Sequence, residues 1–246
     1  MDEFQFNQRL YHKKFKRKKF GIIFILLLII VLSVAAFYLT KPRYKNFEFF
    51  LVGFGDYSNY SQANECAIKL KEIGGAGYIV FDKSYFVVAS VYSSLDDAEK
   101  VKNNINFQKN NVKVLKFNKN INKSQNFLKK SESNKFLKNL EIIKNLIENN
   151  QTIDQNFDKG ELNFVNAKAK LKVNFEQLSS VVDSIKNQTS CLKGSALSNV
   201  YLDNIIECEK RLFESNNEQS FSILIKYQNS CMVENFFNFL SFFWLQ

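Results

Sequence analysis

The hydrophobic pattern begins with one long apolar run. Between Phe20 and Thr40 (FGIIFILLLIIVLSVAAFYLT) the chain has no charged residue. A helix rises about 1.5 Å per residue, so about 20 apolar residues cover the ~30 Å hydrocarbon core of a lipid bilayer. The run therefore predicts a transmembrane helix over residues 20–40, in contact with the lipid bilayer.

Residues 47–118 alternate between short β-like runs and helical stretches. The runs FEFFLVGFG, GYIVFD, YFVVASVY and NVKVLKF are rich in aromatic and β-branched residues, as strands are. The stretch SQANECAIKLKEI has one apolar face at helical spacing, and a second helix follows the N-cap candidate Ser94. The order β-α-β-β-α-β predicts an α+β fold, with one four-stranded antiparallel sheet and two helices.

Residues 119–246 have the periodicity of helices. One seam has apolar residues at steps of four, three and four: Phe136, Leu140, Ile143 and Ile147. Three similar stretches follow, joined by short polar turns, and this pattern predicts an α-helical C-terminal region of hairpins or a small bundle. The polar stretch from Asn118 to Glu132 is typical of a linker.

The C-terminal segment is intensely aromatic. Its sequence FFNFLSFFWL, from Phe236 to Leu245, is too short to span a bilayer. One interpretation is a core helix that fills the bundle. The other is a contact with a membrane surface or a protein partner.

The distribution of charge indicates which partners to expect and how the predicted span is oriented in the membrane. The formal net charge is +10 at pH 7, but seven basic residues lie within residues 1–19, whereas residues 47–118 are neutral. We expect no nucleic-acid partner, because the positive charge flanks the apolar run. The excess of lysine and arginine predicts a basic cytoplasmic tail over 1–19, one span, and an extracytoplasmic C-terminal region at the cell membrane. A cleaved signal peptide with its cleavage site after Ala35 is the alternative.

The chain offers few groups for catalysis. Its only histidine, His12, lies in the basic tail, so a Ser/His/Asp or Cys/His arrangement beyond the apolar run is excluded. The motifs of nucleotide-binding loops, zinc proteases and serine hydrolases are not present. We therefore expect no enzyme, no catalytic residue, no metal and no cofactor.

Three of the four cysteines lie in the helical region, at Cys191, Cys208 and Cys231. A disulfide among them is one interpretation, with its pairing left open. Buried free thiols, which behave as small hydrophobic groups, are the other.

Two stretches within residues 47–118 resemble a known family. FFLVGFGDYSNYSQANECAIKLKEIGGAGYIV and YFVVASVYSSLDDAEKVKNNI are similar to the SPOR (sporulation-related) domain. In that family a first strand of the form aromatic-V-Q-V-G-x-F precedes a helix, a glycine-containing turn, a tyrosine-rich strand and a second helix. The resemblance implies a bacterial single-pass membrane protein of the cell envelope that binds peptidoglycan glycan strands on the open face of the sheet.

The resemblance also implies a glycan-binding site on the first and third strands, formed by Leu51, Gly53, Phe86, Val88, Ser90 and Tyr92. Because side chains alternate along a strand, we expect Leu51, Val88, Ser90 and Tyr92 to share one face. Leu51 and Val88 stand where the family often has Gln and Arg, so this face has fewer polar groups for sugar hydroxyls. The other interpretation is that protein covers the face.

The expected function is therefore peptidoglycan binding at cell division or sporulation septa, by a membrane-anchored protein with a SPOR-like domain over 47–118. The alternative is a structural or scaffold component of an envelope protein complex. In that case the sheet face and the C-terminal helices would make the contacts with envelope protein partners.

Overall fold

The computed structural model describes residues 28, 30–32, 44–106, 111–122, 130–190, 192 and 194–242. The chain divides into two compact units, Met1–Arg43 and Tyr44–Gln246. In the first unit only Leu28 and residues 30–32 are described, and they are helical. The tail predicted over 1–19 lies outside the described residues.

The structure does not support the transmembrane helix predicted over residues 20–40. No helix formed by the described residues is both long enough and apolar enough to cross a membrane. The predicted fold class, which included a transmembrane helix, and the predicted single-pass localisation at the cell membrane are therefore wrong on this finding. The described part of the run, Leu28 and residues 30–32, is far shorter than the about 20 residues that a span needs, and the rest of the run lies outside the described residues.

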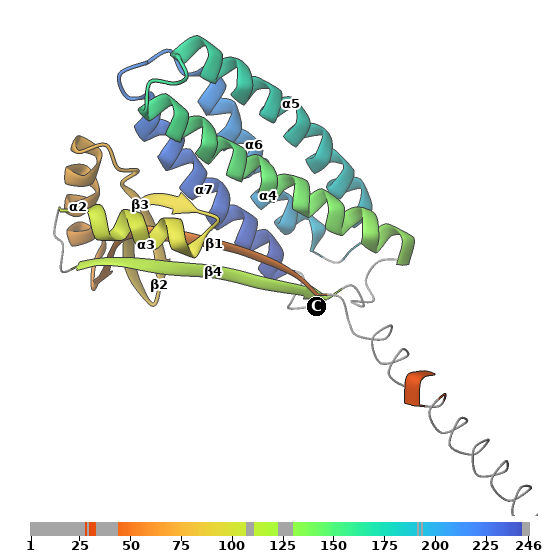
Figure 1. The fold of residues 1–246 in the computed structure, drawn as a ribbon. Helices are drawn as coiled ribbons and strands as arrows, with labels where there is room; N and C mark the ends of the chain where they lie inside the picture. Colours follow the sequence, from red (N-terminus) through yellow and green to blue (C-terminus); the bar gives the residue numbers. More distant parts are fainter. Residues whose placement is uncertain are drawn as a thin grey trace, which may run out of the picture. The chain divides into compact units, whose positions relative to one another are not determined.

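The second unit begins with a four-stranded antiparallel sheet (Figure 1). Its strands are β1 (Tyr44–Tyr57), β2 (Tyr78–Asp82), β3 (Ser84–Tyr92) and β4 (Val112–Asn122). The strand order is β2-β3-β1-β4. The long strands β1 and β4 pair from Tyr44 and Asn122 to Phe54 and Val112, so the last strand continues beyond the predicted boundary at residue 118.

Two capped helices cover one face of the sheet. Helix α2 (Tyr60–Glu72) begins after Asn59, whose side chain accepts a hydrogen bond from the main-chain N–H of Gln62. Helix α3 (Leu95–Asn104) begins after Ser94, which caps it in the same way. Both caps satisfy an N–H group that has no partner within its helix. Apolar side chains of the two helices pack with the sheet in one cluster that includes Phe50, Val52, Phe54, Ala63, Leu70 and Ala98.

Four helices follow the sheet and form a bundle. They are α4 (Lys130–Asp158), α5 (Phe164–Thr189), α6 (Ser195–Glu214) and α7 (Phe221–Phe242). Each helix packs against the next, and α4 also packs against α7. This closed arrangement with short connections is that of an antiparallel four-helix bundle (Figure 1).

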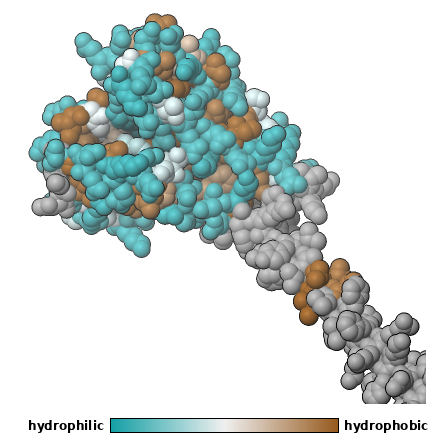
Figure 2. All heavy atoms as spheres, viewed as in Figure 1, coloured by the Kyte–Doolittle hydropathy of each residue, from teal (hydrophilic) through white to brown (hydrophobic). Residues whose placement is uncertain are grey.

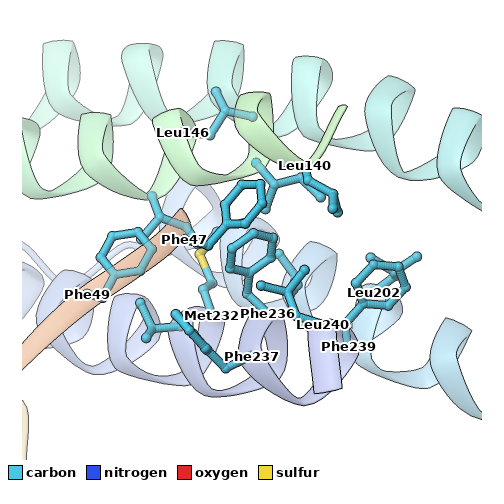
Figure 3. Close-up of a cluster of buried hydrophobic side chains, with 14 of the residues drawn as sticks. Phe47, Phe49, Leu140, Leu146, Leu202, Met232, Phe236, Phe237, Phe239 and Leu240 are labelled. Atoms are coloured by element: carbon cyan, nitrogen blue, oxygen red, sulfur yellow. The ribbon is translucent and has the colours of Figure 1, made fainter. Parts of the chain in front are cut away.

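The aromatic helix α7 packs against the second face of the sheet (Figures 1 and 3). The Phe236 ring meets the Phe47 ring of β1 edge-on, with centroids 5.6 Å apart, and the Phe237 and Phe49 rings are 6.4 Å apart. Four side chains of this segment are buried: Phe236, Phe237, Phe239 and Leu240. As far as Phe242 the C-terminal aromatic segment is therefore a core helix, and both faces of the sheet are covered.

Strand β3 carries one extra residue opposite β1. Val52 pairs with Ser90, but the next residue of β1, Gly53, pairs with Val88. Ala89 lies between them without a partner on β1, which makes it a β-bulge. A bulge reverses the faces to which the following side chains point.

Two main-chain features hold this bulge in place. The N–H group of Ala76, in the loop after α2, donates to the carbonyl oxygen of Ala89 at 2.8 Å. At Gly53 a Cβ atom would lie 2.1 Å from the carbonyl oxygen of Val87, so β3 comes too close to β1 for any side chain there.

Candidate functional site

Four of the six sequence-predicted site residues are core residues. Leu51 and Val88 have no exposed surface, and Phe86 is 6% exposed. These three side chains belong to the cluster that joins the sheet to α4 and α7. Gly53 is buried as well. The sheet face to which the SPOR resemblance assigns glycan is therefore occupied by the bundle in this structure.

The other two residues, Ser90 and Tyr92, follow the bulge and lie on the opposite side of β3. Ser90 is opposite Val52, and Tyr92 is opposite Phe50. Both partners belong to the cluster beneath α2 and α3. The prediction that Ser90 and Tyr92 share a face with the first four residues is therefore wrong, because the strict alternation on which it rested is interrupted.

Ser90 and Tyr92 instead line a cleft between the sheet, the loop after α2 and the bundle. We call it the polar cleft. It has a volume of about 250 Å³. A smaller pocket of about 20 Å³, which we call the inner extension, shares Ser90, Tyr92 and Asp154 with it. One wall is polar, with Ser90, Tyr92, Asp154, Gln155, Asp158 and Lys226. The other wall is apolar, with Leu70, Ile73, Ala89, Val101 and Ile105.

Lys226 of α7 connects the parts of the chain that meet at the polar cleft. Its ammonium group donates to the Asp158 carboxylate of α4 at 2.8 Å and to the Gly74 carbonyl oxygen after α2 at 3.1 Å. It also donates to the Ser222 hydroxyl at 2.8 Å. One cation thus fixes the loop after α2 and two bundle helices around a single point.

Asp154 is the buried carboxyl group of the cleft. It is 7% exposed, accepts a hydrogen bond from the Ser222 hydroxyl at 3.0 Å, and lies 4.0 Å from the Lys226 ammonium group. Burial raises the pKa of Asp154 to about 7, even though Lys226 acts in the opposite direction. Near neutral pH this carboxyl group therefore exists both as a hydrogen-bond donor and as an acceptor.

The two residues of β3 add hydroxyl groups to the cleft. Ser90 donates a hydrogen bond to the Tyr92 hydroxyl at 3.0 Å. Because Tyr92 accepts that bond, its own hydroxyl proton is available to a ligand oxygen. Burial raises the pKa of Tyr92, so the phenol stays neutral at physiological pH.

An amide group also lines the inner extension. Asn229 of α7 is 3% exposed, and its carbonyl oxygen has no hydrogen-bond partner among the described residues. It lines the extension together with Gln151, whose side-chain amide donates to the main-chain carbonyl of Val91. A buried acceptor without a partner costs about 1–3 kcal/mol, so a ligand donor or a water molecule at this point would be favourable.

The donors and acceptors of the cleft suit hydroxyl and amide groups better than a metal ion. Among the residues that the structure describes, no group of three or more His, Cys, Asp or Glu side chains could hold a metal ion. The polar wall can exchange hydrogen bonds with a ligand, and the apolar wall can pack against its C–H surface.

Asp154, Lys226 and Asn229 were not predicted as site residues from the sequence. Asp154 is 68 positions from Ser222, to which it is bonded, so no local motif joins the two helices. One signal was present, because Asp154 lies seven residues after Ile147, which places a charged residue on the apolar seam of its helix. A carboxyl group at a core position indicates a functional or paired site.

The side of the second unit that Figure 2 shows has no broad hydrophobic face. Figure 2 shows one side of the second unit, where hydrophilic residues predominate and hydrophobic ones form small, separate patches. The most exposed aromatic residue in the described part of this unit is Phe81, at 64%, which packs with Tyr85 at 4.9 Å between ring centroids.

Comparisons with known proteins leave the family open. No protein-family model, no curated protein and no solved structure matches this chain. The similarity to SPOR domains therefore remains a prediction from the sequence.

Proposed function

We propose that this chain is a non-catalytic saccharide-binding protein whose ligand occupies the polar cleft. The observation that carries the proposal is the pairing of two different walls in one cleft. Polar groups, among them the buried Asp154 and the partly buried Lys226, line the same cleft as a set of aliphatic side chains. A sugar ring has the same two sides, because its hydroxyl groups lie at the edge and its C–H groups cover the faces.

The size of the cleft limits the ligand. At about 250 Å³ it lies just below the range of 300–1,000 Å³ that is usual for small-molecule pockets. It suits about one sugar residue with a substituent, such as the end or one unit of a chain. The SPOR resemblance makes the glycan of peptidoglycan, with its N-acetylated amino sugars, the first ligand to test.

Calorimetric titration of the full-length protein tests this function. The ligands are soluble β-1,4-linked oligomers of N-acetylglucosamine and peptidoglycan glycan strands freed of stem peptides. We expect saturable binding that Asp154→Asn weakens about tenfold and Tyr92→Phe about fivefold, because each removes one hydrogen bond from the polar wall. Asp203→Asn is the control, since Asp203 pairs with Lys186 on the bundle and does not line the cleft.

A further variant distinguishes the cleft from the exposed aromatic pair. Phe81→Ala removes a stacking ring without touching the cleft. If Phe81→Ala abolishes binding while the two cleft variants bind normally, the saccharide site lies on the outer surface of β2 and the cleft assignment is wrong. If no saccharide binds to the wild type, the proposed function itself is wrong.

A further inference from the structure

Two cysteines of the bundle lie in direct contact. Cys208 of α6 and Cys231 of α7 have their sulfur atoms 2.9 Å apart, and the Cys208 thiol donates a hydrogen bond to the Cys231 sulfur. A disulfide has a bond length of about 2.05 Å, so the sulfur atoms need to approach by only about 0.9 Å. The third described cysteine, Cys66, lies on α2 and packs against the sheet, and Cys191 lies outside the described residues.

The two thiols have different surroundings. Cys208 is 4% exposed, whereas Cys231 is partly exposed. The hydrogen bond from Cys208 lowers the pKa of Cys231 to about 7. The same interaction and burial raise the pKa of Cys208. Cys231 is therefore the thiol that reacts first, and Cys208 is placed to react second.

Charged groups around the pair act in both directions. Arg211 favours the thiolate of Cys231, and Glu234 opposes it. Glu209 is buried next to Cys208 on α6 and adds to the rise in its pKa. The hydrogen bond from Cys208 has a larger effect on the pKa of Cys231 than either charge. The greater exposure of Cys231 favours the same order of reaction.

We propose that Cys208 and Cys231 are a redox site that closes to a disulfide between α6 and α7. The co-reactant is a low-molecular-weight disulfide. The Cys231 thiolate attacks one sulfur of that disulfide, so a mixed disulfide forms and one thiolate leaves. Cys208 then loses its proton and attacks the Cys231 sulfur, which releases the second thiol. Two protein thiols are oxidised, and one disulfide is reduced to two thiols.

The location gives this bond a structural effect. Tyr78 of β2 donates to Glu234 of α7, and the Tyr78 ring lies 5.0 Å from the Tyr227 ring, between centroids. The disulfide therefore joins α6 to the part of α7 that packs against the sheet. Closing it fixes α6 to α7 beside the contacts that α7 makes with β2.

Peptide mapping of the full-length protein tests the proposal. The reduced protein is equilibrated with a glutathione redox buffer, blocked with N-ethylmaleimide and digested with trypsin without reduction. Trypsin cleaves after Lys193, Lys210, Arg211 and Lys226, so Cys191, Cys208 and Cys231 fall in three different peptides. We expect one linked product, Cys208 with Cys231, while the Cys66 and Cys191 peptides carry the maleimide.

Two further measurements complete the test. In the reduced protein at pH 7, Cys231 should be alkylated by iodoacetamide about tenfold faster than Cys208. The control Cys66→Ser should give the same linked product, and Cys231→Ser should leave Cys208 open to maleimide. Maleimide on both Cys208 and Cys231 of the oxidised wild type overturns the proposal, as does a link from either one to Cys66 or Cys191.

Discussion

Phe236 of α7 packs edge-on against Phe47 of β1, with ring centroids 5.6 Å apart. The two residues are far apart in the chain, and both are at most 1% exposed. Their contact lies at the centre of the cluster that joins the sheet to the bundle. The sheet therefore does not have its own separate core on this face, and its stability depends on the C-terminal helix.

This dependence predicts a large loss of stability for Phe236→Ala. Removing a fully buried aromatic ring should lower the free energy of unfolding by about 3–5 kcal/mol. The sheet and the bundle should unfold in one transition in urea, followed by circular dichroism. Val165→Ala, at a side chain that is 72% exposed, is the control and should change the free energy by less than about 0.5 kcal/mol. Separate transitions for the two parts would contradict this account.

The bulge on β3 gives a second prediction. Gly53→Ala places a Cβ atom 2.1 Å from the Val87 carbonyl oxygen, so β1 and β3 must separate. We expect a loss of about 1–3 kcal/mol in the free energy of unfolding, as for other overpacked sites. Urea unfolding measures it, with Ser58→Ala at an exposed position after β1 as the control. Equal midpoints for the wild type and Gly53→Ala would show that the bulge is absent in solution.

Buried Glu209 predicts a pH dependence of stability. Burial raises the pKa of Glu209 to about 8, whereas its ordinary value is 4.5. Between these two values the folded protein holds a proton that the unfolded chain has lost, so this contribution to stability is complete below about pH 4.5 and decreases as the pH rises to about 8. The slope approaches about 1.4 kcal/mol per pH unit within this window.

Glu209→Gln isolates that contribution, because glutamine keeps the shape and can still accept from the Asn150 amide. We expect the variant and the wild type to be similar in stability at pH 5 and the variant to be more stable at pH 8. Thermal unfolding at both pH values measures the difference. A constant difference across this range would mean that Glu209 titrates near its ordinary pKa.

The disulfide also predicts a difference in stability. Cys208 and Cys231 are 23 positions apart. Closing a loop of this length lowers the conformational entropy of the unfolded chain, which should stabilise the fold by about 3 kcal/mol. Urea unfolding of the oxidised and reduced protein measures this difference. The oxidised and reduced forms of Cys231→Ser should have the same urea midpoint. If oxidation raises the midpoint of this variant as much as that of the wild type, another cysteine pair forms the disulfide.

Local patterns predicted strand and helix positions but not what covers the sheet. Alternation and cap residues act over a few positions, and Ser94 caps α3 where its sequence indicates. The contact between Phe47 and Phe236 depends on how the bundle folds back, which no local pattern contains. The apolar run over 20–40 gave a wrong prediction. Its length and apolarity alone predicted a membrane span that no helix of the described residues provides.

At the candidate site too, some residues were predicted from the sequence and others depend on tertiary packing. Ser90 and Tyr92 were named from the sequence and line the polar cleft, although for a different reason from the one predicted. The face assignment failed because one unpaired residue, Ala89, changes the period, and a bulge has no reliable signature in a single sequence. Lys226 and Asp154 meet only through the packing of α4 against α7, which periodicity does not specify.

The position of α7 has a consequence for biosynthesis. This helix follows every other described element along the chain, yet its aromatic residues complete the core on one face of the first strand. While the ribosome is still making the bundle, Phe47, Phe49 and Leu51 have no partner on α7, so this apolar sheet face is incompletely covered. The nascent chain therefore needs protection from aggregation until α7 emerges. Ribosome stalling before residue 221 should trap a state bound by chaperones.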